Sequence, residues 1–154
     1  MDFERSLSAV SANDIVADVL RELCDLTDMG FAAVAGVTEE RWMAFQVLDR
    51  IGFGLKAGDE LEIAATICNE IRESRTPIYI ESVRDSPYWS KHPVPETYGF
   101  QSYVSVPLFR MDRTVYGTLF AIDPLPRLID NAATRKAIGL LAAKTMVAIY
   151  PDAI

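Results

Sequence analysis

Two neighbouring stretches decide how this chain folds: "YGFQSYVSVPLF" (98–109) and "VYGTLFAIDP" (115–124). In both stretches, side chains of different polarity alternate from one residue to the next, and this period of two residues is expected of β-strands. The short turn "RMDR" (110–113) separates them, and Asp123-Pro124 ends the second stretch. Strands joined by so short a turn pair as an antiparallel hairpin. The sequence therefore predicts two paired strands, over Gln101–Phe109 and Thr114–Ile122.

Alternation also assigns each side chain of this hairpin to one face of the sheet. On one face we expect aromatic and hydroxyl residues together: Tyr103, Ser105, Pro107, Thr118, Phe120 and Ile122. On the other face we expect aliphatic residues: Val104, Val106, Leu108, Leu119 and Ala121. The aliphatic face is suited to packing under helices. The mixed face has the composition of a small-molecule site.

Helical periodicity predicts the elements that would cover the aliphatic face. A first helix begins near the capping residues 11–14 and continues to Gly30, with an inward stripe at Ile15, Val16, Val19, Leu20, Leu23 and Leu26. A last helix is capped by Asp130 and runs to about Tyr150, with Ala137, Leu141 and Ala148 inward and Ile138 and Ile149 beside them.

The middle of the chain is predicted to add two strands, a helix and a third strand. Phe31–Val37 and Arg41–Leu48 read as a hairpin. The second helix begins at Asp59 and Glu60, whose charges suit a helix N-terminus, and ends before Pro77. Its inward stripe is Leu61, Ala64, Ala65, Cys68 and Ile71. A short strand follows, over Pro77–Glu81.

An aromatic loop, "SPYWSKHPVPETYGF" (86–100), precedes the first hairpin strand. Tyr88, Trp89, His92 and Tyr98 could close over the mixed face of the sheet and form a lid. A second interpretation is that the loop packs its own aromatic rings on the sheet, while Tyr103 and Phe120 fill the space beneath.

Composition limits the classes of partner. The chain has 154 residues, half of them hydrophobic, and we expect one domain over residues 1–154. Its net charge is −7 and its basic residues are scattered, so nucleic acid is not expected as a partner. "MDFERSLSAV" (1–10) does not resemble a signal peptide, and no segment is apolar enough for a membrane. We expect a cytoplasmic protein without a membrane partner.

Catalytic chemistry is not expected either. There is one histidine, no Gly-x-Ser-x-Gly motif and no cluster with metal-ligand spacing, so we predict no catalytic residue and no metal site. Gly52, Gly54 and Gly58 loosely resemble a dinucleotide-binding loop, but Asp59 and Glu60 would repel a pyrophosphate. These glycines are interpreted as turn residues. Both cysteines, Cys24 and Cys68, are predicted to lie in helices as small hydrophobic residues, away from any pocket.

Taken in order and spacing, the hairpin, the strand "TPIYIES" (76–82) and the flanking helices resemble the GAF domain family. The version with "GTLFAIDP" (117–124) is similar to GAF domains of bacterial sensor histidine kinases and cyclic-di-nucleotide enzymes. The resemblance implies an α+β, PAS-related fold: a central antiparallel sheet, terminal helices on one face, and a ligand pocket on the other, roofed by the second helix and the aromatic loop.

The resemblance also implies a function. The chain would be a sensory, ligand-binding module of a longer two-component or related signal-transduction protein, relaying occupancy through its terminal helices as a homodimer. The alternative is a ligandless dimerisation module. The ligand-binding site that this resemblance implies comprises Tyr88, Trp89, His92, Tyr98, Tyr103, Ser105, Thr118 and Phe120.

The ligand is expected to be neutral or aromatic. Bilin-binding members attach their chromophore through a cysteine in or near the lid, and this chain has none after Cys68, so covalent bilin is disfavoured and the cofactor stays unknown. The Asn-Lys-x-x-x-Phe-x-x-x-Asp-Glu pattern of cyclic-nucleotide-binding members does not occur. A methionine sulfoxide reductase of this family would need several cysteines around its pocket, which disfavours that activity.

Overall fold

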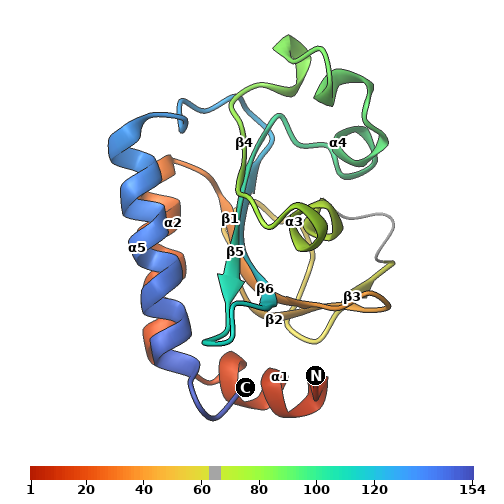
Figure 1. Cartoon of the computed structure of the whole chain (residues 1–154). Helices are drawn as coiled ribbons and strands as arrows, with labels where there is room; N and C mark the ends of the chain where they lie inside the picture. Colours follow the sequence, from red (N-terminus) through yellow and green to blue (C-terminus); the bar gives the residue numbers. More distant parts are fainter. Residues whose placement is uncertain (63–66) are drawn as a thin grey trace.

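A six-stranded antiparallel sheet forms the middle layer of the protein, in the order β3-β2-β1-β6-β5-β4 (Figure 1). The computed structural model describes residues 1–62 and 67–154. The strands are β1 (Phe31–Val37), β2 (Trp42–Asp49), β3 (Glu60–Leu61), β4 (Ile78–Ile80), β5 (Ser102–Phe109) and β6 (Val115–Asp123). The predicted hairpin is β5 and β6, which pair antiparallel and lie near the centre of the sheet.

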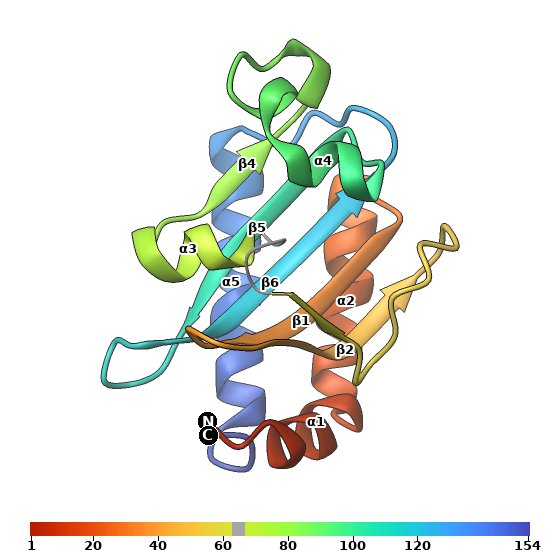
Figure 2. The ribbon, with the colours of Figure 1, turned by 90° about the vertical axis from the view of Figure 1, so that its right-hand side faces the viewer.

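Helices cover both faces of this sheet. On one face lie α2 (Asp14–Thr27) and α5 (Ala132–Ile149), with α1 (Phe3–Ser11) below them (Figure 1). On the opposite face lie α3 (Cys68–Ser74) and α4 (Pro93–Tyr98), which Figure 2 shows in front of the sheet. Two 3₁₀ turns, η2 (Val83–Asp85) and η3 (Trp89–Lys91), link β4 to α4. We call the two sides the helix face and the site face.

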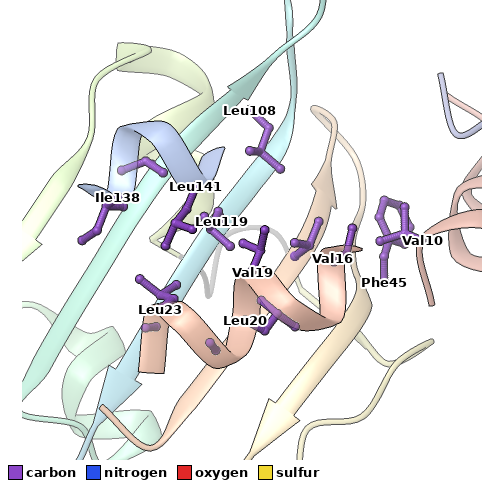
Figure 3. Close-up of a cluster of buried hydrophobic side chains, with 14 of the residues drawn as sticks. Val10, Val16, Val19, Leu20, Leu23, Phe45, Leu108, Leu119, Ile138 and Leu141 are labelled. Atoms are coloured by element: carbon purple, nitrogen blue, oxygen red, sulfur yellow. The ribbon is translucent and has the colours of Figure 1, made fainter. Parts of the chain in front are cut away.

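The predicted division of the hairpin is confirmed. Val104, Val106, Leu108, Leu119 and Ala121 are buried in one cluster with side chains of α2 and α5 (Figure 3). Tyr103, Phe120 and Ile122 belong to a separate cluster on the site face. Burial of each large aliphatic side chain contributes about 1.5–3 kcal/mol, so the helix face supplies much of the stability of the fold.

The inward stripes of both long helices were predicted only in part. Val16, Val19, Leu20 and Leu23 of α2 are buried, but Ile15 and Leu26 are 46% and 43% exposed. In α5 the buried positions are Ile138, Leu141, Thr145 and Ile149, whereas Ala137 and Ala148 are only partly buried. The cap of α5 is Asn131, whose side chain accepts the N–H of Thr134, and the predicted cap Asp130 instead pairs with Arg135.

The first helix of the chain was missed, and the second predicted helix begins too early. No element was predicted over residues 3–11, which form α1, capped by Asp2. Glu60 and Leu61 form β3, because they pair with Met43 and Trp42 along the outer edge of β2. The predicted inward residues Ala64 and Ala65 lie outside the described residues, and α3 begins at Cys68.

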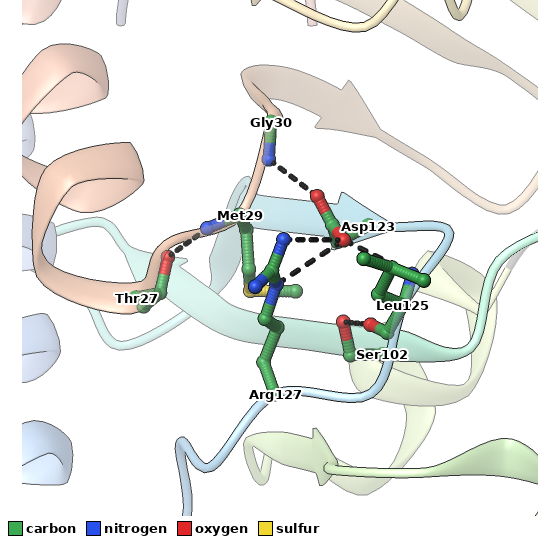
Figure 4. Close-up of polar contacts among 7 residues, drawn as sticks. All are labelled: Thr27, Met29, Gly30, Ser102, Asp123, Leu125 and Arg127. Carbon is green, nitrogen blue, oxygen red and sulfur yellow. Dashed lines mark hydrogen bonds and ion pairs between the residues drawn. The ribbon is translucent and has the colours of Figure 1, made fainter.

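A buried carboxylate ties the end of β6 to its neighbours (Figure 4). The carboxylate of Asp123 accepts the N–H of Gly30 at 2.9 Å and the N–H of Leu125 at 3.0 Å. The Nε–H group of Arg127 donates to Oδ2 of Asp123 at 3.2 Å, and Nη2 of the same guanidinium lies 3.1 Å from that oxygen. The side chain is 4% exposed. Asp123 therefore ends the sheet, as predicted, and also joins β1 to the connection before α5.

Candidate functional site

A small cavity of about 40 Å³ lies between the site face of the sheet and the segments above it. The sheet contributes Trp42, Tyr103, Phe120 and Ile122 to its lining. Ile67 and Cys68 at the start of α3 and Leu61 of β3 line it from the side, and Val94, Tyr98 and Phe100 line it from α4 and the residues after that helix. The cavity is therefore almost entirely apolar.

Stacked aromatic rings keep this cavity narrow. The ring centres of Phe100 and Tyr103 lie 5.3 Å apart, and those of Tyr103 and Phe120 lie 6.2 Å apart, both pairs nearly parallel. Trp42 meets Phe120 at a tilt, with ring centres 6.0 Å apart. Typical ligand pockets measure roughly 300–1,000 Å³, so in this conformation the aromatic rings fill most of the space between the sheet and its cover.

The glycine-rich segment after β2 forms part of that cover. Phe53 and Leu55 line the cavity, and Phe53 packs against Phe31 with their ring centres 4.9 Å apart. The carboxylate of Asp49 holds the segment by accepting the N–H groups of Ile51, Phe53 and Gly54 at 2.9–3.1 Å. Burial alone would raise the pKa of Asp49, but these donors outweigh it and lower the pKa.

The glycines of this segment serve its turns. Gly52, Gly54 and Gly58 have φ of 68°, 99° and 92°, in the region where side chains are strained. Because Asp49 already occupies the N–H groups, the loop does not offer them to a phosphate. The interpretation of these glycines as turn residues is confirmed.

A group of polar side chains surrounds the thiol of Cys68, which itself lines the cavity. The Sγ atom of Cys68 lies 3.0 Å from Oγ1 of Thr118 and 3.7 Å from the hydroxyl of Tyr103. Burial raises the pKa of the Cys68 thiol, and the nearby groups of Thr118, Trp42, Tyr103 and Ser105 oppose that rise without cancelling it. Burial likewise raises the pKa of Tyr103 well above its ordinary value. The cluster is therefore neutral at physiological pH.

Two members of this cluster lack hydrogen-bond partners. The indole N–H of Trp42 and the hydroxyl of Ser105 are buried and make no hydrogen bond with any described residue. Trp42 is 2% exposed and Ser105 is fully buried. We call Trp42, Cys68, Tyr103, Ser105 and Thr118 the polar floor; the first three line the cavity, and Ser105 and Thr118 do not.

The structure brings together some of the residues predicted for the site and separates others. Tyr98, Tyr103 and Phe120 line the cavity. Ser105 and Thr118 are buried beside Cys68 but are not among the described residues that line the cavity. Tyr88, Trp89 and His92 are not among the described residues that line it. Tyr88 is 61% exposed. Contact of these three residues with a ligand stays a prediction.

Glu70 of α3 joins two of those three residues, Tyr88 and His92. Its Oε1 accepts the hydroxyl of Tyr88 at 3.2 Å and Nε2–H of His92 at 3.1 Å. The Nδ1 atom of His92 accepts the N–H of Val94, so His92 caps α4. Trp89 packs edge-on against Tyr88, with ring centres 4.7 Å apart. These rings thus pack partly on one another, whereas the second interpretation placed the rings of the loop on the sheet.

One placement predicted from the sequence is wrong. Cys68 was expected away from the pocket, yet it lines the cavity, because α3 starts at Cys68 itself and lies over β5 and β6. Cys24 does lie on the opposite, helix face. Sequence reasoning also missed Trp42, Phe53 and Leu55. For Phe53 and Leu55 the available signal was two large apolar side chains within a glycine-rich segment that should otherwise be polar.

Within residues 1–62 and 67–154, no three His, Cys, Asp or Glu side chains gather in a way that could hold a metal ion. In the same part of the chain, none of the helices combines the length and the apolar character needed to cross a membrane.

Residues 11–149 match the family model of the GAF domain. No curated protein sequence matches the chain significantly.

Solved structures of the same fold come from proteins with different activities. The GAF domain of an Acinetobacter phosphoenolpyruvate-protein phosphotransferase is 14% identical, with a TM-score of 0.67 over 96% of this chain and 89% of that one. The chromophore-binding domain of a bacteriophytochrome from R. palustris is 14% identical, with a TM-score of 0.70 over 95% of this chain and 60% of that one. The free methionine-R-sulfoxide reductase of Neisseria meningitidis, solved with its substrate, is 16% identical, with a TM-score of 0.62 over 96% of this chain and 85% of that one. At sequence identities this low, the similarity to these structures shows a shared fold and nothing further.

Proposed function

The chain belongs to the GAF domain family, whose members are generally regulatory or sensory, and we propose that it is a sensory module that binds a small neutral molecule in the cavity on its site face. The observation that carries this proposal is the cavity itself: a largely apolar space with a polar floor, on the face opposite the terminal helices. Apolar lining with a few polar groups is typical of small-molecule sites.

The strands offer a path from this cavity to the terminal helices. Tyr103 and Phe120 face the cavity, while their neighbours Val104 and Leu119 are buried among side chains of α2 and α5. A ligand that displaces the cavity rings shifts β5 or β6 and so changes the packing of α5. A ligand that binds one of two such arrangements more tightly shifts their populations. This supports a role inside a longer bacterial signalling protein, such as a histidine kinase or a cyclic-di-nucleotide enzyme.

We propose no catalytic role for the domain. The two cysteines lie on opposite faces of the sheet, so they cannot form a disulfide with each other without large rearrangement. Burial raises the pKa of both thiols, that of Cys24 to about 11, which lowers their reactivity.

The test is a screen of small neutral molecules by thermal unfolding, together with native mass spectrometry of freshly purified protein. We expect at least one molecule to raise the melting temperature with increasing concentration, because ligand binding stabilises the folded state. Phe120→Ala should change that affinity, and Leu140→Ala, a change on the exposed side of α5, should not. Trp89→Ala tests the prediction that the aromatic loop reaches the ligand. If no molecule binds and no bound mass is found, the proposal fails.

A ligandless dimerisation module is the second candidate function, and two observations favour it. The cavity is small because Phe100, Tyr103 and Phe120 stack within it. On α5, Leu140 and Val147 are 63% and 78% exposed, and an apolar helix face can pair with a second copy. Sedimentation of the wild type and of Val147→Glu tests this. A wild-type dimer that the variant abolishes would support pairing through this helix.

A further inference from the structure

The wall of the cavity indicates which class of small molecule fits it. Resting on the proposed binding function, we propose that the ligand is an apolar molecule of about three non-hydrogen atoms without hydrogen-bonding groups, such as a short hydrocarbon. Such a molecule gains free energy by leaving water and by contact with the carbon atoms of the wall.

The first step is the chemistry of the wall. None of the described side chains that line the cavity is charged, so a carboxylate or an ammonium group would lose its hydration there without gaining an opposite charge. Four of the described lining side chains contain a polar atom: Trp42, Cys68, Tyr98 and Tyr103. The other eight consist of carbon and hydrogen alone: Phe53, Leu55, Leu61, Ile67, Val94, Phe100, Phe120 and Ile122.

The second step is that three of the four polar atoms are already engaged or are covered. The Sγ atom of Cys68 lies 3.0 Å from Oγ1 of Thr118 and 3.7 Å from the hydroxyl of Tyr103, so these groups pair with one another. The indole nitrogen of Trp42 has no partner among the described residues, but it is covered so closely that a molecule the size of water scarcely touches it. A polar ligand would therefore lose its hydration without gaining hydrogen bonds from these groups.

The fourth polar group, the hydroxyl of Tyr98, belongs to the rim of the cavity. Tyr98, Phe53, Leu55 and Leu61 are partly exposed, whereas the other described lining residues are buried. Tyr98 and Phe53 pack together there, with ring centres 6.3 Å apart. These four side chains mark the side from which a ligand can enter. A hydroxyl at the rim can bond to water, so a ligand gains little by replacing that water.

The third step is the size of the ligand. A water molecule needs roughly 10–15 Å³ measured in this way, so a cavity of about 40 Å³ holds about three non-hydrogen atoms. Water itself needs several polar partners, which this wall does not offer, and apolar cavities in proteins stay dry and bind apolar molecules. A benzene-sized ring needs a cavity on the order of 150 Å³, which disfavours the aromatic ligand expected from the sequence.

Propane and ethanol form a matched pair of probes, because their chains of non-hydrogen atoms have the same length and only ethanol has a hydroxyl group. Methyl signals in ¹³C–¹H spectra report on the cavity through Leu55, Ile67 and Val94, and Leu140, which is 63% exposed, serves as the reference. We expect dissolved propane to move the cavity signals to saturation and to leave the Leu140 signals in place. Ethanol should bind at least about tenfold more weakly, since its hydroxyl would be buried without a partner.

Three variants complete the test. Val94→Ile adds a methylene group to a buried lining residue and should weaken propane binding at least about tenfold, because it fills the cavity. Val147→Ile makes the same change at a position that is 78% exposed and should have no effect. Tyr98→Phe removes the hydroxyl at the rim and should change the affinity for neither probe.

A variant that enlarges the cavity keeps the size argument testable if Val94→Ile fails to fold. Ile122→Val removes a methylene group from the wall, so this variant should bind butane more tightly than the wild type does. Butane bound no more tightly by Ile122→Val would overturn the inferred size.

The outcomes separate this inference from the proposed function. Equal affinities for propane and ethanol, or an unchanged propane affinity in Val94→Ile, overturn the inference and leave the binding function intact. A loss of ethanol binding in Tyr98→Phe also overturns it, because that hydroxyl would then serve a polar ligand. Failure of propane to bind overturns it as well, and the wider screen then decides whether the cavity binds any molecule at all.

Discussion

Two buried polar clusters lie on this sheet and differ in how far their groups are paired. Around Asp123, the carboxylate meets two backbone N–H groups and the guanidinium of Arg127 (Figure 4). In the polar floor, Trp42 and Ser105 have no partner among the described residues. Full pairing is what a structural cluster requires, since each unpaired buried group costs about 1–3 kcal/mol. The difference teaches that the first cluster holds the fold together, whereas the second leaves Trp42 and Ser105 outside the hydrogen bonds that join the described residues.

The largest expected effect comes from breaking the paired cluster. Asp123→Ala leaves the N–H groups of Gly30 and Leu125 without acceptors and Arg127 without its counter-ion. We expect the free energy of unfolding, measured in urea, to fall by about 3 kcal/mol. Asp25→Ala is the control, because its ion pair with Arg50 is exposed, and should cause no measurable change. A loss from Asp123→Ala no larger than that of the control would contradict the structural role.

A medium effect is expected at alkaline pH, where the neutral groups would ionise. Burial raises the pKa of Cys68 and Tyr103, and raises that of Cys24 from 9.0 to about 11. Groups with a raised pKa contribute stability that is fully present below their ordinary pKa and is lost as pH rises through the raised value. The contribution of these groups to the free energy of unfolding, measured in urea, should therefore be constant up to about pH 9. It should then decrease between about pH 9 and pH 11.

The same burial predicts the chemical behaviour of the thiols. In folded protein at pH 8, both cysteines should react with a thiol reagent only at the rate of unfolding, since they are buried and protonated. Cys68→Ser removes one site and assigns the slow phases. Fast reaction of Cys68 in the native protein would show that the cavity opens without unfolding, so that it admits molecules larger than its closed volume of about 40 Å³.

The sequence predicted the parts of the fold that depend on alternation within single strands. The faces of β5 and β6 follow directly from the order of Tyr103 to Leu108 and of Thr118 to Ile122, and both were confirmed. The family was also recognised from these strands and confirmed. These predictions held because one residue pattern fixes one face of a strand.

The parts of the site that were missed depend on irregularities that a pattern does not encode. A bulge in the pairing of β1 with β2 puts Ala35 opposite Ala44 and Val34 opposite Gln46, so alternation along β2 is broken at Phe45. Without that bulge, simple alternation does not place both Trp42 and Val47 on the site face. Cys68 was misplaced because pairing of Glu60 and Leu61 with β2 removed the first turns of the predicted helix. Tertiary pairing overrode local propensity in both cases.

The smallest expected change in stability comes from Leu140→Ala, and its comparison with Phe120→Ala is the most direct test of the central claim, that the cavity on the site face binds a small molecule. Leu140 is 63% exposed, whereas Phe120 lines the cavity, so only Phe120→Ala should change the rise in melting temperature that a molecule found in the screen produces. The same rise in both variants would contradict the account, because the molecule would then bind elsewhere on the protein.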